Sequence, residues 1–206
     1  MPIMDDAEFL LDQLEHKDRY LPTIEKMGEH RRCEWLSVRL LLKKMLGEEI
    51  EIAYLPSGKP YLTDSSYYIS ISHTKGYVAA IASQTRRVAI DIEQIATRVE
   101  RVKERFMSEE EIANLSTTEP LIHLLLHWSA KESLFKLLDE SKIEFKTQLH
   151  VRPFAPVLNK ESSFEAYETR TERKGEFVIN YIVIEQYVLT YVNTSLSTSS
   201  DFNSGK

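Results

Sequence analysis

Three segments of the chain repeat apolar residues at helical spacing. Residues 4–15 form a short acidic pattern, and residues 29–46 form a longer amphipathic one that is followed by Gly47. A glycine directly after the last periodic residue is typical of a helix C-terminus. Residues 121–139 carry a third pattern of this kind. The sequence therefore predicts one short helix and two long ones.

Alternating apolar and polar residues, rich in β-branched and aromatic side chains, follow a Pro- and Gly-containing turn at residues 56–60. Such alternation is typical of β-strands. The predicted strands are residues 67–72, 77–83, 88–92, 164–170, 176–185 and 187–192. The spacing of the first three predicts a meander of antiparallel strands.

The order of helices, strands, helices and strands predicts an α+β fold with two comparable halves. We place these halves at residues 1–93 and 94–192. Within the second half, Ser108 is followed three residues later by Glu111, which is the capping-box signature of another helix start. Residues 193–206 are rich in Ser and Thr and carry few apolar side chains, so we predict a disordered tail.

The composition indicates a globular intracellular protein. With 206 residues, 42% hydrophobic and 28% charged, the chain is long enough to bury a substantial core, which excludes disorder of the whole. No apolar run is long enough to cross a bilayer and the first residues lack the basic region of a secretory signal, so we expect a cytoplasmic protein without membrane association. Cys33 is the only cysteine. An internal disulfide and a zinc site of several thiolates are thereby excluded.

The net charge of −6 argues against a general nucleic-acid-binding protein, because the phosphate backbone is held mainly by clustered Lys and Arg. Residues 17–46 depart from this balance, with eight basic and four acidic residues. This segment is either a solvated helix face or a local site for phosphates or an acidic partner. Because the chain as a whole is acidic, any phosphate site must be confined to a local patch.

Two carboxylates leave the same face of the strand predicted at 88–92. Asp91 and Glu93 are two residues apart, whereas Ile90 and Ile92 point to the other side. Repulsion between the two should raise at least one pKa by about 1 to 3 units unless a cation neutralises them. The alternative is a solvated pair on an ordinary strand. The flanking isoleucines favour a central strand and a site.

One stripe of the helix at 121–139 combines three kinds of chemistry. Trp128, Glu132 and Lys136 recur every four residues, a drift of only about 40° per step, and Lys131 borders them. The alternative is an ordinary surface ion pair beside a buried tryptophan. An aromatic ring, a carboxylate and an ammonium group in one row are suited to anchoring the helix, holding a hard cation and meeting a phosphate.

Two histidine patterns invite other interpretations. His123 and His127 have the i,i+4 spacing of a zinc pair, but they face away from Glu132 and no general base lies between them. We interpret them as core or edge histidines. Ser72 and His73 are adjacent on a strand and point to opposite faces, so they do not form a nucleophile and its base. His73 is better suited to donate a hydrogen bond to an anion.

Taken together, five ordered motifs resemble those of the 4′-phosphopantetheinyl transferases. They are GKPYL at 58–62, ISISHTKGYVAAIA at 69–82, VAIDIEQ at 88–94, RFMSEEE at 105–111 and WSAKESLFK at 128–136. The upstream helix also resembles the basic helix of the family, through Arg32, Glu34, Trp35, Leu36 and Arg39. The chain length resembles the larger, pseudo-dimeric type that activates surfactin synthetase.

Two positions depart from the family pattern. Ala89 stands where the family usually has glycine before IDIE, and Ser133 stands where KEA is commoner. We expect both to be tolerated. Beyond about residue 140 the resemblance is limited to the general layout.

The resemblance implies an activity and a fold. The family transfers the phosphopantetheine arm of coenzyme A to a serine of an apo acyl or peptidyl carrier protein and releases 3′,5′-ADP. Its fold consists of two similar α+β halves related by a pseudo-twofold axis, each with a small, mostly antiparallel sheet packed on a long helix, and the active site lies in the cleft between them. A pseudo-dimer needs no second chain, so a monomer is expected.

The resemblance also implies the site residues. Asp91, Glu93 and Glu132 would hold Mg²⁺, with Mn²⁺ as a substitute, and oxygen ligands are those that such ions prefer. The implied coenzyme A contacts are Gly58, Lys59, Pro60, Ser72, His73, Lys131 and Lys136, with Arg32 and Arg39 on the 3′-phosphate. Glu132 would act as general base, with Glu110 or Glu111 as the alternative. Asp91 and Lys136 complete the catalytic set, Lys136 by stabilising or protonating the leaving group.

Two other functions stay open from the sequence. One is a magnesium-dependent pyrophosphate hydrolase acting on coenzyme A or a related nucleotide. The other is a non-catalytic relative that only binds carrier proteins. The sequence leaves open which carrier and pathway are served and which acyl-coenzyme A variants are accepted.

Overall fold

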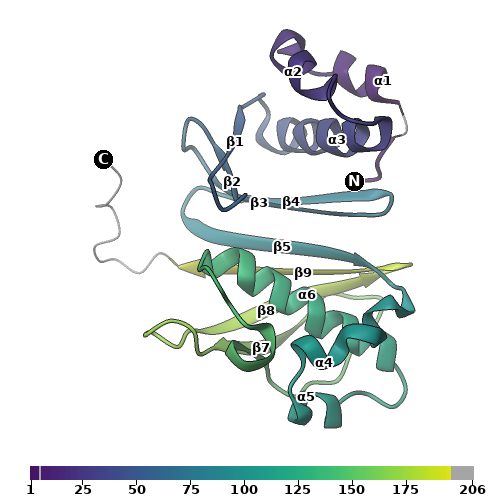
Figure 1. The fold of residues 1–206 in the computed structure, drawn as a ribbon, viewed down its shortest axis with the longest axis vertical. Helices are drawn as coiled ribbons and strands as arrows, with labels where there is room; N and C mark the ends of the chain where they lie inside the picture. The colour runs from purple at the N-terminus through teal and green to yellow at the C-terminus, as the bar shows by residue number, and fades with distance from the viewer. Residues whose placement is uncertain (5, 196–206) are drawn as a thin grey trace.

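A computed structural model describes residues 1–4 and 6–195 of the chain. Figure 1 shows a helical layer, a pair of hairpins and a larger sheet stacked along the long axis. The helical layer and hairpins come from the first half of the sequence. Their elements are α1 (Ala7–Asp12), α2 (Lys17–Ile24), α3 (Glu29–Leu46), β1 (Ile52–Tyr54), β2 (Pro60–Leu62), β3 (Tyr68–Thr74) and β4 (Tyr77–Ser83).

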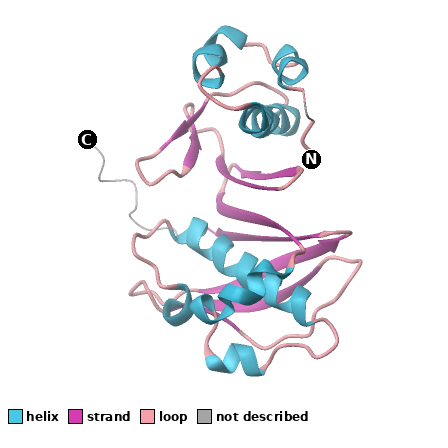
Figure 2. Cartoon of the chain, turned by 45° about the vertical axis from the view of Figure 1, so that its right-hand side comes forward, coloured by secondary structure: helices cyan, strands magenta, loops and turns pink. Residues whose placement is uncertain are grey.

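The rest of the described chain forms a second α+β part. Its elements are β5 (Arg86–Gln94), η1 (Thr97–Val102), α4 (Lys103–Phe106), α5 (Glu109–Ala113), α6 (Pro120–Leu138), α7 (Phe145–Gln148), β6 (Leu149–Val151), β7 (Ser162–Glu168), β8 (Glu176–Ile184) and β9 (Tyr187–Ser195). Helices and antiparallel strands alternate as expected (Figure 2), which confirms the α+β class. None of the helices in the described ranges is long and apolar enough to cross a membrane.

Two of the predicted helix boundaries are confirmed. Helix α3 ends where predicted, since Gly47 adopts a φ of 82° and donates its N–H to the carbonyl of Lys43. The capping box is confirmed at α5, where Ser108 and Glu111 bond reciprocally. The helix predicted over 4–15 is shorter, and α2, which has Pro22 inside it, was not predicted.

The strands form three antiparallel sheets. The first two are the hairpins β1–β2 and β3–β4, and the third has the order β5-β9-β8-β7-β6. The predicted meander is therefore wrong at its third strand: β5 pairs with β9, the last strand, with Asp91 opposite Thr190. Strand β9 also extends to Ser195, so the predicted tail begins too early, and residues 196–206 lie outside the described residues.

Side-chain hydroxyls join the two parts at β3 and β5. Backbone N–H groups of Ile90, Ile92 and Gln94 donate to the hydroxyls of Ser70, Ser72 and Thr74, at 3.2 to 3.3 Å. These hydroxyls satisfy the edge of β5 that β9 leaves open. This explains why β5 follows β3 closely without a backbone ladder between them. The division expected at residue 93 lies at the C-terminal end of β5.

Two long helices cover the sheets. Helix α3 packs Val38 and Leu42 against the hairpins, and α6 packs Leu126 and Leu134 on the five-stranded sheet. A smaller cluster around Ile90 fills the junction between β4 and the sheet. Because α6 lies directly on β5 and β9, its side chains are brought to the strand that carries Asp91 and Glu93.

Candidate functional site

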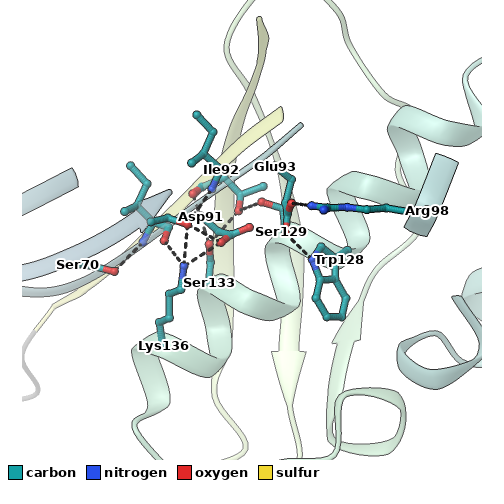
Figure 3. A network of polar contacts seen from close by, with 12 residues as sticks. Ser70, Asp91, Ile92, Glu93, Arg98, Trp128, Ser129, Ser133 and Lys136 are labelled. Carbon is teal, nitrogen blue, oxygen red and sulfur yellow. Dashed lines mark hydrogen bonds and ion pairs between the residues drawn. The ribbon is translucent and has the colours of Figure 1, made fainter. Parts of the chain in front are cut away.

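Asp91 is the centre of the polar network in Figure 3. Its side chain comes from β5 and the residue is only 4% exposed. Oδ1 accepts hydrogen bonds from the ammonium of Lys136 at 2.8 Å and the hydroxyl of Ser72 at 2.9 Å. The other oxygen, Oδ2, is buried and has no hydrogen-bond partner among the described residues. A buried carboxylate oxygen without a partner is costly and is suited to a ligand.

Glu93 lies two residues further along β5 and is half-buried. Its Oε1 accepts from the indole Nε1 of Trp128 at 2.7 Å, and Oε2 accepts from Arg98 at 3.3 Å. Burial and the nearby Asp91 raise the pKa of Glu93, against the effect of these two donors. The direction of this shift agrees with the rise expected for the pair, although burial contributes more to it than repulsion by Asp91 does.

Glu132 faces the same carboxylates from α6. Burial raises its pKa to about 7, and the charges of Asp91 and Glu93 act in the same direction, whereas Lys136 acts against them. Three acidic side chains from a strand and a helix therefore influence one another electrostatically. A group held partly protonated near neutral pH is suited to proton transfer.

The donor set fits a hard divalent cation. Three carboxylates, one of them with a free buried oxygen, are the ligands that Mg²⁺ and Mn²⁺ prefer. Among the described residues, however, no three acidic, histidine or cysteine side chains are gathered closely enough to hold an ion as they stand. Asp91 is held by Lys136, and Glu93 by Trp128 and Arg98. Side-chain rotations are needed before the three can share a ligand.

Four of the expected coenzyme A contacts lie where the two halves of the chain meet: Gly58, Lys59, Pro60 and Ser72. Lys59 lies near the C-terminal end of α6, where its ammonium forms an ion pair with Asp139 at 3.1 Å. Gly58 allows this turn because it adopts a φ of 87°, and Pro60 begins β2. Ser72 belongs to the Asp91 network. The Lys59 turn, Ser72 and α6 thus join the two halves of the chain at one place.

His73 is exposed at the end of β3 and points to the other side from Ser72, as predicted. Its Nδ1 lies 3.5 Å from Glu34, and its Nε2 lies 3.3 Å from the guanidinium of Arg31. Arg31 was not among the residues predicted from the sequence. Its position three residues before Glu34, on the same helix face, was the available signal.

The side chains of Arg32 and Arg39 make their contacts within the first half of the chain. The Nε of Arg32 donates to the carbonyls of Ile24 and Met27, and so satisfies the C-terminal end of α2. Arg39 is 5% exposed and stacks over the ring of Trp35. Among the described residues it is the guanidinium of Arg31 that lies within 3.3 Å of His73.

Lys131 is fully buried. Its ammonium donates to Glu111 at 2.8 Å and to the carbonyls of Phe106 and Phe145. Burial alone would raise the pKa of Glu111, but the nearby His127 and Lys131 outweigh it and lower the pKa to about 2. The structure thus brings Lys136, but not Lys131, to Asp91. Glu111 is poorly suited to act as a base near neutral pH.

His123 and His127 are core residues, as interpreted from the sequence. They are 1% and 2% exposed and line a small cavity of about 90 Å³ behind α6. His123 accepts a hydrogen bond from the backbone N–H of Ser116, and burial together with His127 lowers its pKa to about 4. The metal-like spacing therefore reflects packing.

The comparison with protein families gives a match to the second half of the chain. The family model of the 4′-phosphopantetheinyl transferase superfamily matches residues 87–192, which is just over half of the chain. The matched span includes Asp91, Glu93, Glu132 and Lys136. A search of the curated proteins finds no match.

Proposed function

The chain belongs to the 4′-phosphopantetheinyl transferase superfamily, and from this premise we propose that it loads an apo acyl or peptidyl carrier protein. Phosphopantetheinyl transfer from coenzyme A is the activity of the superfamily. The proposed reaction attaches the 4′-phosphopantetheine group to a carrier serine and releases 3′,5′-ADP. The observation that carries the proposal is the buried network of Asp91, Ser72 and Lys136 beside Glu93 and Glu132.

Asp91, Glu93 and Glu132 would hold Mg²⁺ or Mn²⁺. When bound, the ion would supply positive charge that neutralises the pyrophosphate of coenzyme A. The unpartnered Oδ2 of Asp91 and the mutual repulsion of the three carboxylates support this assignment. To hold the ion, Glu132 would have to be ionised.

The chain's other residues position the phosphates. Lys59, His73 and Arg31 lie on the hairpin and α3 side, and we assign them to the nucleotide phosphates. Arg31 replaces Arg32 and Arg39 in this role because its guanidinium is half-exposed next to His73. Lys136 contacts the pyrophosphate once it leaves Asp91.

The transfer breaks the bond between the β-phosphorus and the oxygen that bridges it to the α-phosphate. The carrier serine oxygen forms the new bond to the β-phosphorus, and its proton passes to Glu132, directly or through a water molecule. Glu132 has to be ionised to accept this proton, as it would be when it holds the ion. The ammonium of Lys136 stabilises the charge that develops on the departing 3′,5′-ADP.

The test is a loading assay with coenzyme A, Mg²⁺ and a panel of apo carrier proteins, read by intact mass. The proposal predicts a gain of one phosphopantetheine group on at least one carrier. Asp91→Asn and Glu132→Gln should each lower the rate by about 100-fold or more, since they remove a charged ligand and, for Glu132, the base. Release of 3′,5′-ADP without an acceptor would instead identify a hydrolase. Unchanged carriers and no 3′,5′-ADP would contradict both.

A further inference from the structure

The ammonium of Lys136 occupies the place where a cation is expected. It donates to Oδ1 of Asp91 at 2.8 Å, to the carbonyl of Ile90 at 3.0 Å and to the hydroxyl of Ser72 at 3.1 Å. All three partners are oxygen atoms from β3 and β5. Figure 3 shows Lys136 extending from α6 toward Asp91. An ammonium group has three protons, so this environment uses its donor capacity fully.

The same contact occupies one oxygen of Asp91 and leaves the other without a partner among the described residues. Lys136 draws Oδ1 of Asp91 toward Ser72, while the opposite oxygen, Oδ2, stays buried without a partner. Glu132 lies one turn before Lys136 on α6, and its charge is partly offset by the ammonium. Lys136 thus supplies positive charge beside Asp91 and Glu132, whereas Arg98 lies against Glu93.

We propose that Lys136 is an internal cation that holds Asp91 in the metal-free protein and competes with a divalent ion for its Oδ1. Entry of the ion displaces the ammonium from Asp91, and the displaced ammonium becomes available to an anionic group of the substrate. Metal binding and exposure of Lys136 are therefore linked. The role of Lys136 toward substrate rests on the proposed function, whereas its competition with the ion does not.

The first test measures binding of Mn²⁺ alone to the full metal-free chain by calorimetry. Lys136→Met should bind Mn²⁺ about tenfold more tightly than wild type, equivalent to about 1.4 kcal/mol. Lys43→Met is the matched control, because Lys43 is also an ion-paired, partly exposed lysine, bonded to Glu15 at a distance from this site. It should leave the affinity unchanged. Unchanged or weaker binding by Lys136→Met would overturn the proposal.

A mutant cycle separates competition from simple loss of a nearby charge. If Lys136 competes for Asp91, Lys136→Met has little effect on Mn²⁺ affinity in an Asp91→Asn background but keeps its full effect in a Glu93→Gln background. If the ammonium acts only through its charge, the gain is similar in both backgrounds, and the proposal is wrong.

A second measurement needs no variant. Lysine acylation of the wild-type chain, followed by peptide mass spectrometry, should modify Lys136 several-fold faster when Mg²⁺ is added, because the ammonium loses its oxygen partners. Lys43 serves as the internal reference and should not change. An unaltered rate at Lys136 under saturating Mg²⁺ would contradict displacement, whatever the outcome of the carrier-loading assay.

Discussion

The indole Nε1 of Trp128 donates a hydrogen bond of 2.7 Å to Oε1 of Glu93, and so links α6 to the edge strand β5. The Trp128 ring packs edge-on against Phe106, with centroids 5.0 Å apart. An aromatic ring that is fixed by packing thus holds one carboxylate of the candidate site in a defined orientation. Partners of this kind orient metal ligands in many proteins.

Trp128→Phe tests this orientation. The substitution keeps an aromatic ring in the pocket but removes the donor to Glu93, so we expect Mn²⁺ affinity to fall by about tenfold. Calorimetry on the metal-free protein measures the change, and the urea midpoint controls for global destabilisation. Unchanged affinity in a stable variant would show that Glu93 needs no such support.

The raised pKa of Glu132 predicts pH-dependent metal binding. An ion must displace the proton that Glu132 keeps below pH of about 7, so affinity for Mn²⁺ should increase from pH 6 to pH 8. Titrations in a weakly buffered solution near pH 7 should also record proton release. Glu132→Gln should bind Mn²⁺ more weakly. Its affinity should also depend less on pH, because it lacks this titrating carboxyl.

The same shift predicts a stability effect with an unusual sign. The folded-state pKa of Glu132, about 7, lies above the ordinary value of 4.5, so its ionisation opposes folding as the pH rises through this interval. In metal-free protein at pH 8, Glu132→Gln should therefore be more stable than wild type, by about 1 to 3 kcal/mol. Urea unfolding at pH 5 and pH 8 measures this, and the gain should be smaller at pH 5. A loss of stability at pH 8 would contradict the assignment.

Lys131 is expected to be structural. Lys131→Met leaves Glu111 charged and buried without its ammonium partner, and such a break costs about 3 to 5 kcal/mol. Adding Glu111→Gln should restore part of the loss. Denaturant midpoints measure both, with Lys17→Met as the control, which loses an exposed ion pair with Asp12. A fully stable Lys131→Met with impaired coenzyme A binding would support the phosphate contact instead.

Thr190 fixes α6 on the sheet. Its hydroxyl lies 2.9 Å from that of Ser129 and 2.8 Å from that of Ser133, and Thr190 faces Asp91 across the β5–β9 ladder. Thr190→Val should cost about 1 to 3 kcal/mol because it removes the hydroxyl partner of Ser129 and leaves Ser133 only the carbonyl of residue 190, at 3.4 Å. Ser133→Ala, which introduces the residue commoner in the family motif, should cost less. Urea unfolding compares the two, and equal costs would contradict this role of Thr190.

The sequence predicted the helices α3 and α6 and most strands because their signals are local. Apolar periodicity, Gly47 after α3 and the Ser108 capping box each act within a few residues. The partner of β5 was missed for the opposite reason. Strand β9 is about one hundred residues away, and nothing in β5 distinguishes it from a hairpin neighbour.

The same distinction between local signals and long-range packing applies to the candidate site. The sequence alone determined that Asp91 and Glu93 share a face and that Trp128, Glu132 and Lys136 share a stripe, because strand and helix periods fix these directions. Only the tertiary structure decided which lysine of α6 reaches Asp91 and which arginine of α3 faces His73. Adjacent helix residues point about 100° apart, and packing against distant elements selects which of them is buried and which meets the site.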